Sequence, residues 1–225
     1  MLKCNQIVTM EISAKFTLRF GGGNMENETV KNSNRELVLK AGEEVFSKKG
    51  LFGARVDEIA LLSGVNKRLV YKEFSSKEEL YKAVLHEAYK KMANAESKIF
   101  ASYKTCEEAI RNIIKMYFEF LNSNPSYVKL ILWENLNEGK YIKEMDLSDV
   151  KTKVIDYMYS VLSEGKKKGE FKEDTDENQV VFSIMTFTFS YFSNKHTMAN
   201  FLKENIDFEK RVKDVTEMIL SNIKK

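Results

Sequence analysis

The sequence predicts an all-α protein with a small N-terminal unit of short helices and a larger helical C-terminal domain. Helix breakers are sparse, because the 225 residues include one Pro and ten Gly. Apolar residues recur three and four positions apart along most of the chain, which is the spacing of one helix face. Hydrophobic residues make up 43% of the chain, so it can bury a substantial core.

The composition also excludes several classes of protein. The two cysteines, Cys4 and Cys106, are far apart and predict neither a disulfide framework nor a zinc site, so a reducing cytoplasm is the expected location. No apolar run approaches the roughly 18–20 residues that span a bilayer, so no membrane association is expected. His86 and His196 have no metal-ligand neighbours, and nucleophile motifs and Gly-rich phosphate loops are absent. We therefore expect no enzyme, metal or cofactor.

Residues 1–30 are expected to form a flexible extension. Thr, Glu and Ser interrupt any signal-like apolar core in the first 24 residues, and the stretch FGGGN ends just before Met25. A further hypothesis is that Met25 is the natural start of the chain, which N-terminal sequencing of natively expressed protein would test. The N-terminal domain is assigned to residues 31–78 and the C-terminal domain to residues 79–225.

The first two helices of the N-terminal domain are predicted from their terminal residues. The first helix is expected to begin at a cap on Asn32 or Ser33 and to end at Gly50, after two lysines that suit the negative end of the helix dipole. The second is expected over residues 56–63. Gly64 then lets the chain turn, because glycine adopts a positive φ without strain.

The third helix is expected over residues 67–74, with Asn66 as its N-cap. Ser75 or Ser76 should cap a long fourth helix that has acidic residues in its first turn. The segment that holds these helices, residues 31–91, carries 13 Lys or Arg and 9 Asp or Glu, whereas the net charge of the whole chain is only +3. The positive charge is therefore concentrated here.

Two short helices joined by a turn of about three to four residues that contains Gly form a helix-turn-helix unit. In that unit the second helix lies in the major groove of DNA. Val70 and Phe74 should face the core of the domain, which leaves Lys67, Arg68 and Lys72 on the opposite face. The spacing therefore predicts a DNA-binding surface on the third helix.

Three stretches in this region resemble the DNA-binding domain of the TetR family of transcriptional regulators: RELVLKAGEEVFSKKG, VDEIALLSGV and LVYKEFSSKEEL. The resemblance runs without a gap from about residue 35 to residue 85, and the chain departs from the family at four positions. Gly42 replaces the usual Ala, at an expected cost of about 1 kcal/mol in a helix. Arg55 replaces a capping Thr, Arg68 replaces a common Gly or Pro, and Glu73 adds a repulsive charge beside a phosphate position.

The resemblance implies which residues meet DNA. Lys67, Arg68 and Leu69 fall on the base-contacting positions, where Arg or Lys can donate to guanine and Leu can contact a thymine methyl group. Neighbouring side chains suit phosphate contacts, which fix register without reading sequence. The predicted DNA-binding residues are Arg55, Asn66, Lys67, Arg68, Leu69, Tyr71, Lys72 and Lys77. The alternative is that these cations form a solvated helix face.

The remaining two-thirds of the chain predicts further helices. They are expected at residues 106–123, 126–136, 148–168, 176–195 and 206–223. The stretch NEGKYIKEMD is expected to be a loop, and GKKKGEF a helix end followed by a turn. The second of these stretches also resembles the regulatory domain of the family.

The last two of these helices predict a homodimer. The stretch VVFSIMTFTFSYF is apolar nearly all round, which indicates burial on more than one side. The final helix carries an apolar stripe made of Phe208, Val212, Val215, Ile219 and Ile223. Pairing both helices with their two-fold copies would form a four-helix interface. The alternative is that both helices complete an intrachain core.

A pocket between central helices, lined by aromatic and Met side chains, is the predicted site of a small-molecule effector. The residues assigned to it are Tyr117, Phe118, Trp133, Tyr157, Met158, Met185 and Phe187. The alternative is that each of them is ordinary core. Glu119, Glu134 and Asp156 fall near this set and would favour a cationic ligand.

Together these patterns predict a dimeric, sequence-specific regulator of transcription that binds double-stranded operator DNA. Its action as a repressor, released by a small apolar or aromatic ligand, is implied by the resemblance alone, because an activator would carry the same motifs. The alternative function is a helical protein-interaction module that uses the helix-turn-helix as a scaffold, and Glu73 is the main support for it.

Overall fold

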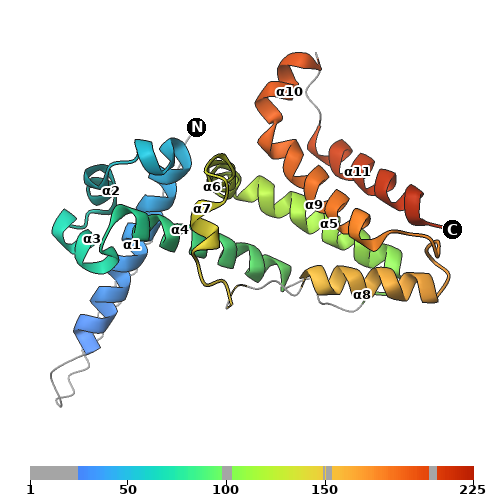
Figure 1. The fold of residues 1–225 in the computed structure, drawn as a ribbon, viewed down its shortest axis with the longest axis horizontal. Coiled ribbons are helices and arrows are strands. Elements are labelled where there is room, and N and C mark those ends of the chain that lie inside the picture. The colour runs from blue at the N-terminus through green and yellow to red at the C-terminus, as the bar shows by residue number, and fades with distance from the viewer. Residues whose placement is uncertain (1–24, 98–102, 149, 151–153, 203–206) are drawn as a thin grey trace, which may run out of the picture.

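The computed structural model describes residues 25–97, 103–148, 150, 154–202 and 207–225, with side chains from residue 34 onward. Every regular element in these ranges is a helix, which confirms the predicted all-α class. The helices form two units that lie at opposite ends of the molecule (Figure 1). Within the described part of the chain, no helix combines the length and the apolar content that crossing a bilayer requires.

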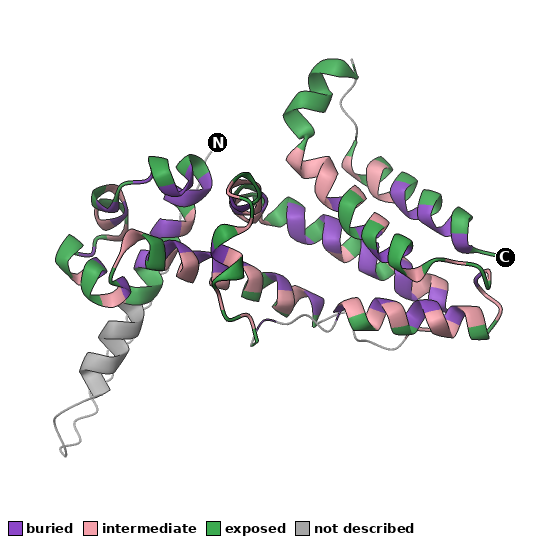
Figure 2. Cartoon of the chain, viewed as in Figure 1, coloured by how far each residue is buried: buried purple, intermediate pink, exposed green. Residues whose placement is uncertain are grey.

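The N-terminal unit consists of four helices in the predicted order: α1 (Met25–Gly53), α2 (Val56–Ser63), α3 (Lys67–Phe74) and α4 (Lys77–Glu96). Its core is formed by apolar side chains from all four helices, among them Phe46, Ile59, Val70, Phe74 and Leu80. The other face of each helix is exposed (Figure 2). Helix α4 leads from this core towards the C-terminal unit (Figure 1).

Two details of the first helix differ from the prediction. Helix α1 begins at Met25, so Asn32 and Ser33 lie inside it and do not cap its start. The predicted break at Gly50 is present, because this residue has φ 65° and ψ 179°, but one further turn follows it to Gly53. Ser76 caps α4: its hydroxyl accepts a hydrogen bond from the backbone N–H of Glu79 at 3.0 Å.

The C-terminal unit contains seven helices in the described ranges: α5 (Cys106–Ser123), α6 (Pro125–Leu136), α7 (Lys140–Lys143), α8 (Val154–Lys167), α9 (Glu177–Ser193), α10 (Lys195–Phe201) and α11 (Phe208–Ile223). Helix α5 contributes the most buried face, and α8, α9 and α11 pack around it. Helices α9 and α11 lie side by side at the edge of this bundle (Figure 1).

Several boundaries in this unit differ from the prediction. The expected loop NEGKYIKEMD contains the short helix α7, and residues 148 and 150 precede α8 rather than belonging to it. Helix α9 ends at Ser193 and is followed by α10, which was not predicted. The parts of the predicted helices at residues 149, 151–153 and 206 lie outside the described residues.

The apolar stripe of α11 is covered within the same chain, contrary to the expectation that a partner would cover it. Val215, Ile219 and Ile223 are buried against α5 and α9. Helix α9 also buries one side only, because Phe182 is 66% exposed and Met185 is 40% exposed. Exposed apolar side chains therefore remain on the outer face of α9, at Met218 of α11 and along α10.

The two units are joined at α6, which packs against α1. The indole N–H of Trp133 donates to the carbonyl oxygen of Ser47 at 3.2 Å. The Trp133 ring also lies so close to Gly50 that a Cβ there would be 2.8 Å from ring atoms. This contact requires a glycine for space as well as for its positive φ.

Candidate nucleic-acid interface

The turn between α2 and α3 is built as the sequence predicts. Gly64 is left-handed, with φ 69°, and its N–H donates to the carbonyl oxygen of Leu61. The side-chain oxygen of Asn66 accepts a hydrogen bond from the backbone N–H of Arg68 at 2.8 Å, which caps α3. Val70 and Phe74 are buried, and these contacts fix the orientation of α3 on the domain.

The opposite side of α3 is a cationic surface. Lys67, Arg68, Tyr71 and Lys72 are exposed there, and we call these four residues the basic face of α3. Tyr71 is 42% exposed, so its hydroxyl can reach a phosphate. Arg68 has no side-chain ion pair with any described residue. Its guanidinium N–H groups are therefore free to donate hydrogen bonds to the edge of a DNA base.

Lys67 is held by an acidic residue of the preceding helix. Its ammonium nitrogen lies 2.7 Å from Oδ1 of Asp57 in α2, and both side chains are solvent-exposed. The hydrogen bond with Asp57 raises the pKa of Lys67. This partner was not predicted, because the contact crosses the turn and has no helical spacing that would reveal it.

Three of the predicted DNA-binding residues also have structural roles. Asn66 caps α3, and Leu69 is partly buried and packs against the core of the domain. The ammonium of Lys77 donates to the carbonyl oxygen of Ala54 at 3.2 Å, so it joins the start of α4 to the α1–α2 connection. Arg55 is exposed at the N-cap position of α2, and its side chain makes no capping hydrogen bond. This agrees with the expectation that the cap is lost where Arg replaces a capping Thr.

Sequence reasoning missed a further cation, which lies at the C-terminal end of α3. The guanidinium carbon of Arg35, on α1, lies 4.6 Å from the centre of the Phe74 ring. Such stacking holds the charge beside the end of α3. Glu73, which was expected to repel a DNA phosphate, is partly buried on the same helix.

The predicted effector-binding residues are distributed over several different environments. Tyr117, Phe118 and Met158 belong to the core of the C-terminal unit. The Tyr117 hydroxyl donates to a carboxylate oxygen of the buried Glu96 at 2.8 Å, and burial is the largest cause that raises the pKa of this phenol. Phe118 packs edge-on against Tyr191.

The other predicted effector residues lie at the edge of this core or outside it. Trp133 lies at the contact between the two units, Met185 is exposed on α9, and Phe187 lines a groove between α9 and α11. Tyr157 is partly buried, and its ring packs edge-on against that of Tyr103. The structure therefore does not bring the seven residues together around one cavity.

The carboxylates expected beside the effector are placed differently from the prediction. Glu134 is buried, and one of its oxygens accepts hydrogen bonds from the backbone N–H groups of Tyr141 and Ile142, at 2.7 and 3.0 Å. It therefore caps α7, and this satisfied position explains why a buried carboxylate is tolerated. Glu119 and Asp156 are exposed.

Comparison with known proteins identifies the family. The model of the bacterial regulatory proteins of the tetR family matches residues 38–84, and that of the tetracyclin repressor-like C-terminal domain matches residues 107–223. The HTH-type transcriptional repressor NicS of Pseudomonas putida is 30% identical over 169 residues, which cover 75% of this chain and 80% of NicS. The chain belongs to the TetR family. This TetR-family protein is thus a DNA-binding regulator of transcription.

Further relatives agree with this assignment. The HTH-type transcriptional regulator RutR of Escherichia coli is 25% identical over 197 residues, which cover 86% of this chain and 92% of RutR. The structure of the regulator FadR from Bacillus subtilis in complex with stearoyl-CoA superposes with a TM-score of 0.64 at 21% identity, covering 84% of this chain and 98% of that one. The second comparison shows a shared fold.

Proposed function

We propose that this TetR-family regulator acts as a homodimeric repressor that reads its operator with the basic face of α3 and is released by an apolar ligand. The observation that carries the proposal is the division of α3 into a buried side, with Val70 and Phe74, and an exposed side that presents cations. A recognition helix held by its apolar side presents its N-terminal residues to base edges.

The roles of the basic face and of the residues around it follow from their geometry. Arg68 is exposed, lies in the first turn of α3, and suits a bidentate contact with guanine. Tyr71, Lys72 and Arg55 suit phosphate oxygens, which contribute affinity at every sequence. Lys77 and Asn66 contribute mainly by positioning, because their side chains bond to the backbone of the domain.

A fluorescence-anisotropy titration tests operator binding. The labelled duplex is the DNA upstream of the gene for this protein, and the control duplex has the same composition in scrambled order. We expect tighter binding to the upstream duplex and an affinity that falls steeply with salt for both, because cations displace counterions from phosphates. Binding that is insensitive to salt and to sequence would favour the protein-interaction scaffold instead.

The homodimer is supported by the outer face of α9. Phe182 and Met185 on α9, and Met218 on α11, are exposed on neighbouring helices, and a soluble domain gains stability by covering such side chains. A dimer also presents two copies of α3 to two half-sites. Light scattering at micromolar concentration should give the mass of a dimer, and Phe182→Glu with Met185→Glu should give a monomer. A monomeric wild-type protein would refute this part of the proposal.

Release by an apolar ligand is supported by the C-terminal unit. Its core is rich in aromatic and Met side chains, and a fold-level neighbour has been captured with stearoyl-CoA. Repression is supported by the likeness to NicS, which is named as a repressor. Adding fatty acyl and aromatic compounds to the protein–operator complex should lower the anisotropy for one of these classes. A reporter under the upstream promoter should rise when the gene for this protein is deleted, whereas a fall would indicate an activator.

A further inference from the structure

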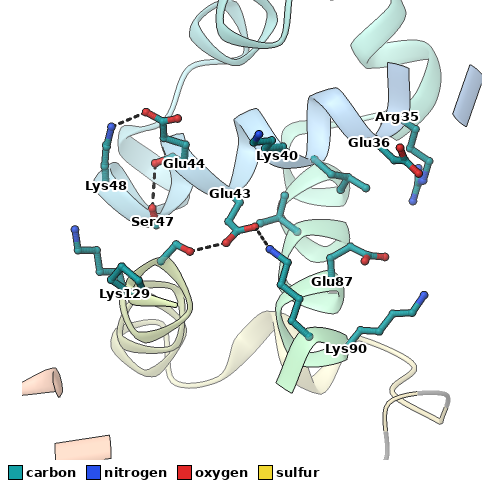
Figure 3. A pocket seen from close by; sticks show the side chains of 15 residues that line it. Arg35, Glu36, Lys40, Glu43, Glu44, Ser47, Lys48, Glu87, Lys90 and Lys129 are labelled. Atoms are coloured by element: carbon teal, nitrogen blue, oxygen red, sulfur yellow. Dashed lines mark hydrogen bonds and ion pairs between the residues drawn. The ribbon is translucent and has the colours of Figure 1, made fainter. Parts of the chain in front are cut away.

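A cleft of about 870 Å³ lies between α1, α4 and the first turn of α6 (Figure 3). We call it the α1/α4/α6 cleft. Its volume falls in the range of small-molecule sites. None of its lining residues belongs to the basic face of α3 or to the predicted effector set. The cleft is formed by both units, because α1 is part of the N-terminal unit and α6 of the C-terminal unit.

The charge of the cleft favours an anion. Six cationic side chains line it: Arg35, Lys40, Lys48, Lys90, Lys91 and Lys129. Four glutamates are also present, and two of them, Glu44 and Glu43, already form ion pairs with Lys48 and Lys91. Lys40, Lys90 and Lys129 are exposed and have no ion pair with any residue in the described ranges. These three cations come from three different helices.

A carboxylate of the chain already occupies the centre of this cleft. One oxygen of Glu43 accepts a hydrogen bond from the hydroxyl of Ser126 at 2.5 Å, and the other accepts one from the ammonium of Lys91 at 2.5 Å. Figure 3 shows both contacts, with Lys129 on one side of Glu43 and Lys90 on the other. The cleft therefore has a position where a hydroxyl, a cation and the start of α6 together stabilise negatively charged oxygen.

We propose that the α1/α4/α6 cleft binds a small polyanion with phosphate groups, held by Lys40, Lys90 and Lys129, and that Glu43 is the internal anion it displaces. Lysine suits this role because its ammonium acts as a mobile point charge for phosphate. Apolar side chains of Leu39 and Val84 also line the cleft and offer contact to an organic part of the ligand. This site is independent of the proposed operator and effector.

Isothermal titration calorimetry with inorganic tripolyphosphate at low ionic strength tests the site on the full chain. We expect wild-type protein to bind it, and the variant Lys90→Gln with Lys129→Gln to bind at least about tenfold more weakly, because two charge-assisted contacts are lost. The matched control is Lys104→Gln with Lys115→Gln, which removes the same charge from exposed positions outside the cleft. The control should retain wild-type affinity.

Glu43→Gln provides a second measurement on the same site. We expect it to bind tripolyphosphate more tightly than wild type, because the ligand no longer competes with a carboxylate for Lys91. The proposal is overturned if wild-type protein gives no binding heat. Equal losses in the two lysine double variants would also overturn it, because they would indicate general attraction to a basic protein. Weaker binding by Glu43→Gln would refute the role assigned to that residue.

Discussion

The two units of this protein differ in where the side chains predicted to bind a ligand lie. Most of those in the N-terminal unit are exposed, whereas several of those in the C-terminal unit are buried. In the N-terminal unit the cations of the basic face of α3 are exposed, and the apolar side chains beneath them only hold the helix in place. In the C-terminal unit three of the predicted effector residues, Tyr117, Phe118 and Met158, face inward and belong to the core. A binding surface can therefore be recognised from an exposed pattern, whereas a buried pattern is shared by ligand pockets and by ordinary packing.

The largest expected effect tests whether the predicted effector residues are core. Phe118 is fully buried among α5, α9 and α11, so Phe118→Ala should lower the free energy of unfolding by about 3–5 kcal/mol. Urea denaturation followed by circular dichroism measures this change. A loss below about 1 kcal/mol would show that the side chain borders an open cavity instead, which would restore it as an effector contact.

The next effect concerns the junction between the two units. Gly50→Ala should destabilise the protein by about 2–4 kcal/mol, because it combines a left-handed backbone with overlap against the Trp133 ring. Gly53→Ala is the control, since its φ is not positive and its added Cβ would meet only the Cβ of Lys49, at 3.3 Å. Thermal unfolding of both variants distinguishes these cases. Equal melting temperatures would mean that neither the positive φ of Gly50 nor its contact with Trp133 is maintained in solution.

A smaller effect is expected from the acidic partner of the basic face. Asp57→Asn frees Lys67 and removes a negative charge beside the DNA, so affinity should rise for operator and scrambled duplexes alike. Because exposed ion pairs are weak, the increase should be below about fivefold. Anisotropy titrations over a salt series measure it. A gain confined to the operator would show that Lys67 reads bases once released.

The smallest effect is expected at Gly42, the position where the TetR family usually has Ala. An added Cβ would lie 3.0 Å from a methyl group of Val84, so glycine allows α1 and α4 to approach closely. Gly42→Ala gains about 1 kcal/mol of helix propensity and loses a similar amount to crowding, so stability should change by less than about 0.5 kcal/mol. Chemical denaturation that shows a full 1 kcal/mol gain would mean that the helices have room to spare.

Elements whose limits are set by local signals were predicted well. Helices α2, α3 and α5 begin and end where the sequence indicates, because capping side chains and Gly64 act within a few residues. Helix α7 was missed because Glu134, a residue of another helix, caps it. The start of α1 was placed too late because Asn32 and Ser33 are good caps but are also tolerated inside a helix.

The candidate site shows the same difference between features set by local sequence and features set by contacts between helices. The exposed positions of α3 follow from helical periodicity and from the two buried residues, Val70 and Phe74. The pairing of Lys67 with Asp57 and the stacking of Arg35 on Phe74 depend on how helices cross, and no spacing in the sequence encodes them. For α11 the apolar stripe was recognised, but its partner was not, because a stripe does not indicate which chain covers it.

The central claim is that the basic face of α3 reads the operator, and Arg68→Ala tests it most directly. Anisotropy titrations would compare wild type and this variant on the upstream duplex and on the scrambled duplex. We predict a loss of about 1–3 kcal/mol on the upstream duplex and a much smaller loss on the scrambled one, because a base contact is made only at the cognate site. Equal losses on the two duplexes would contradict the claim.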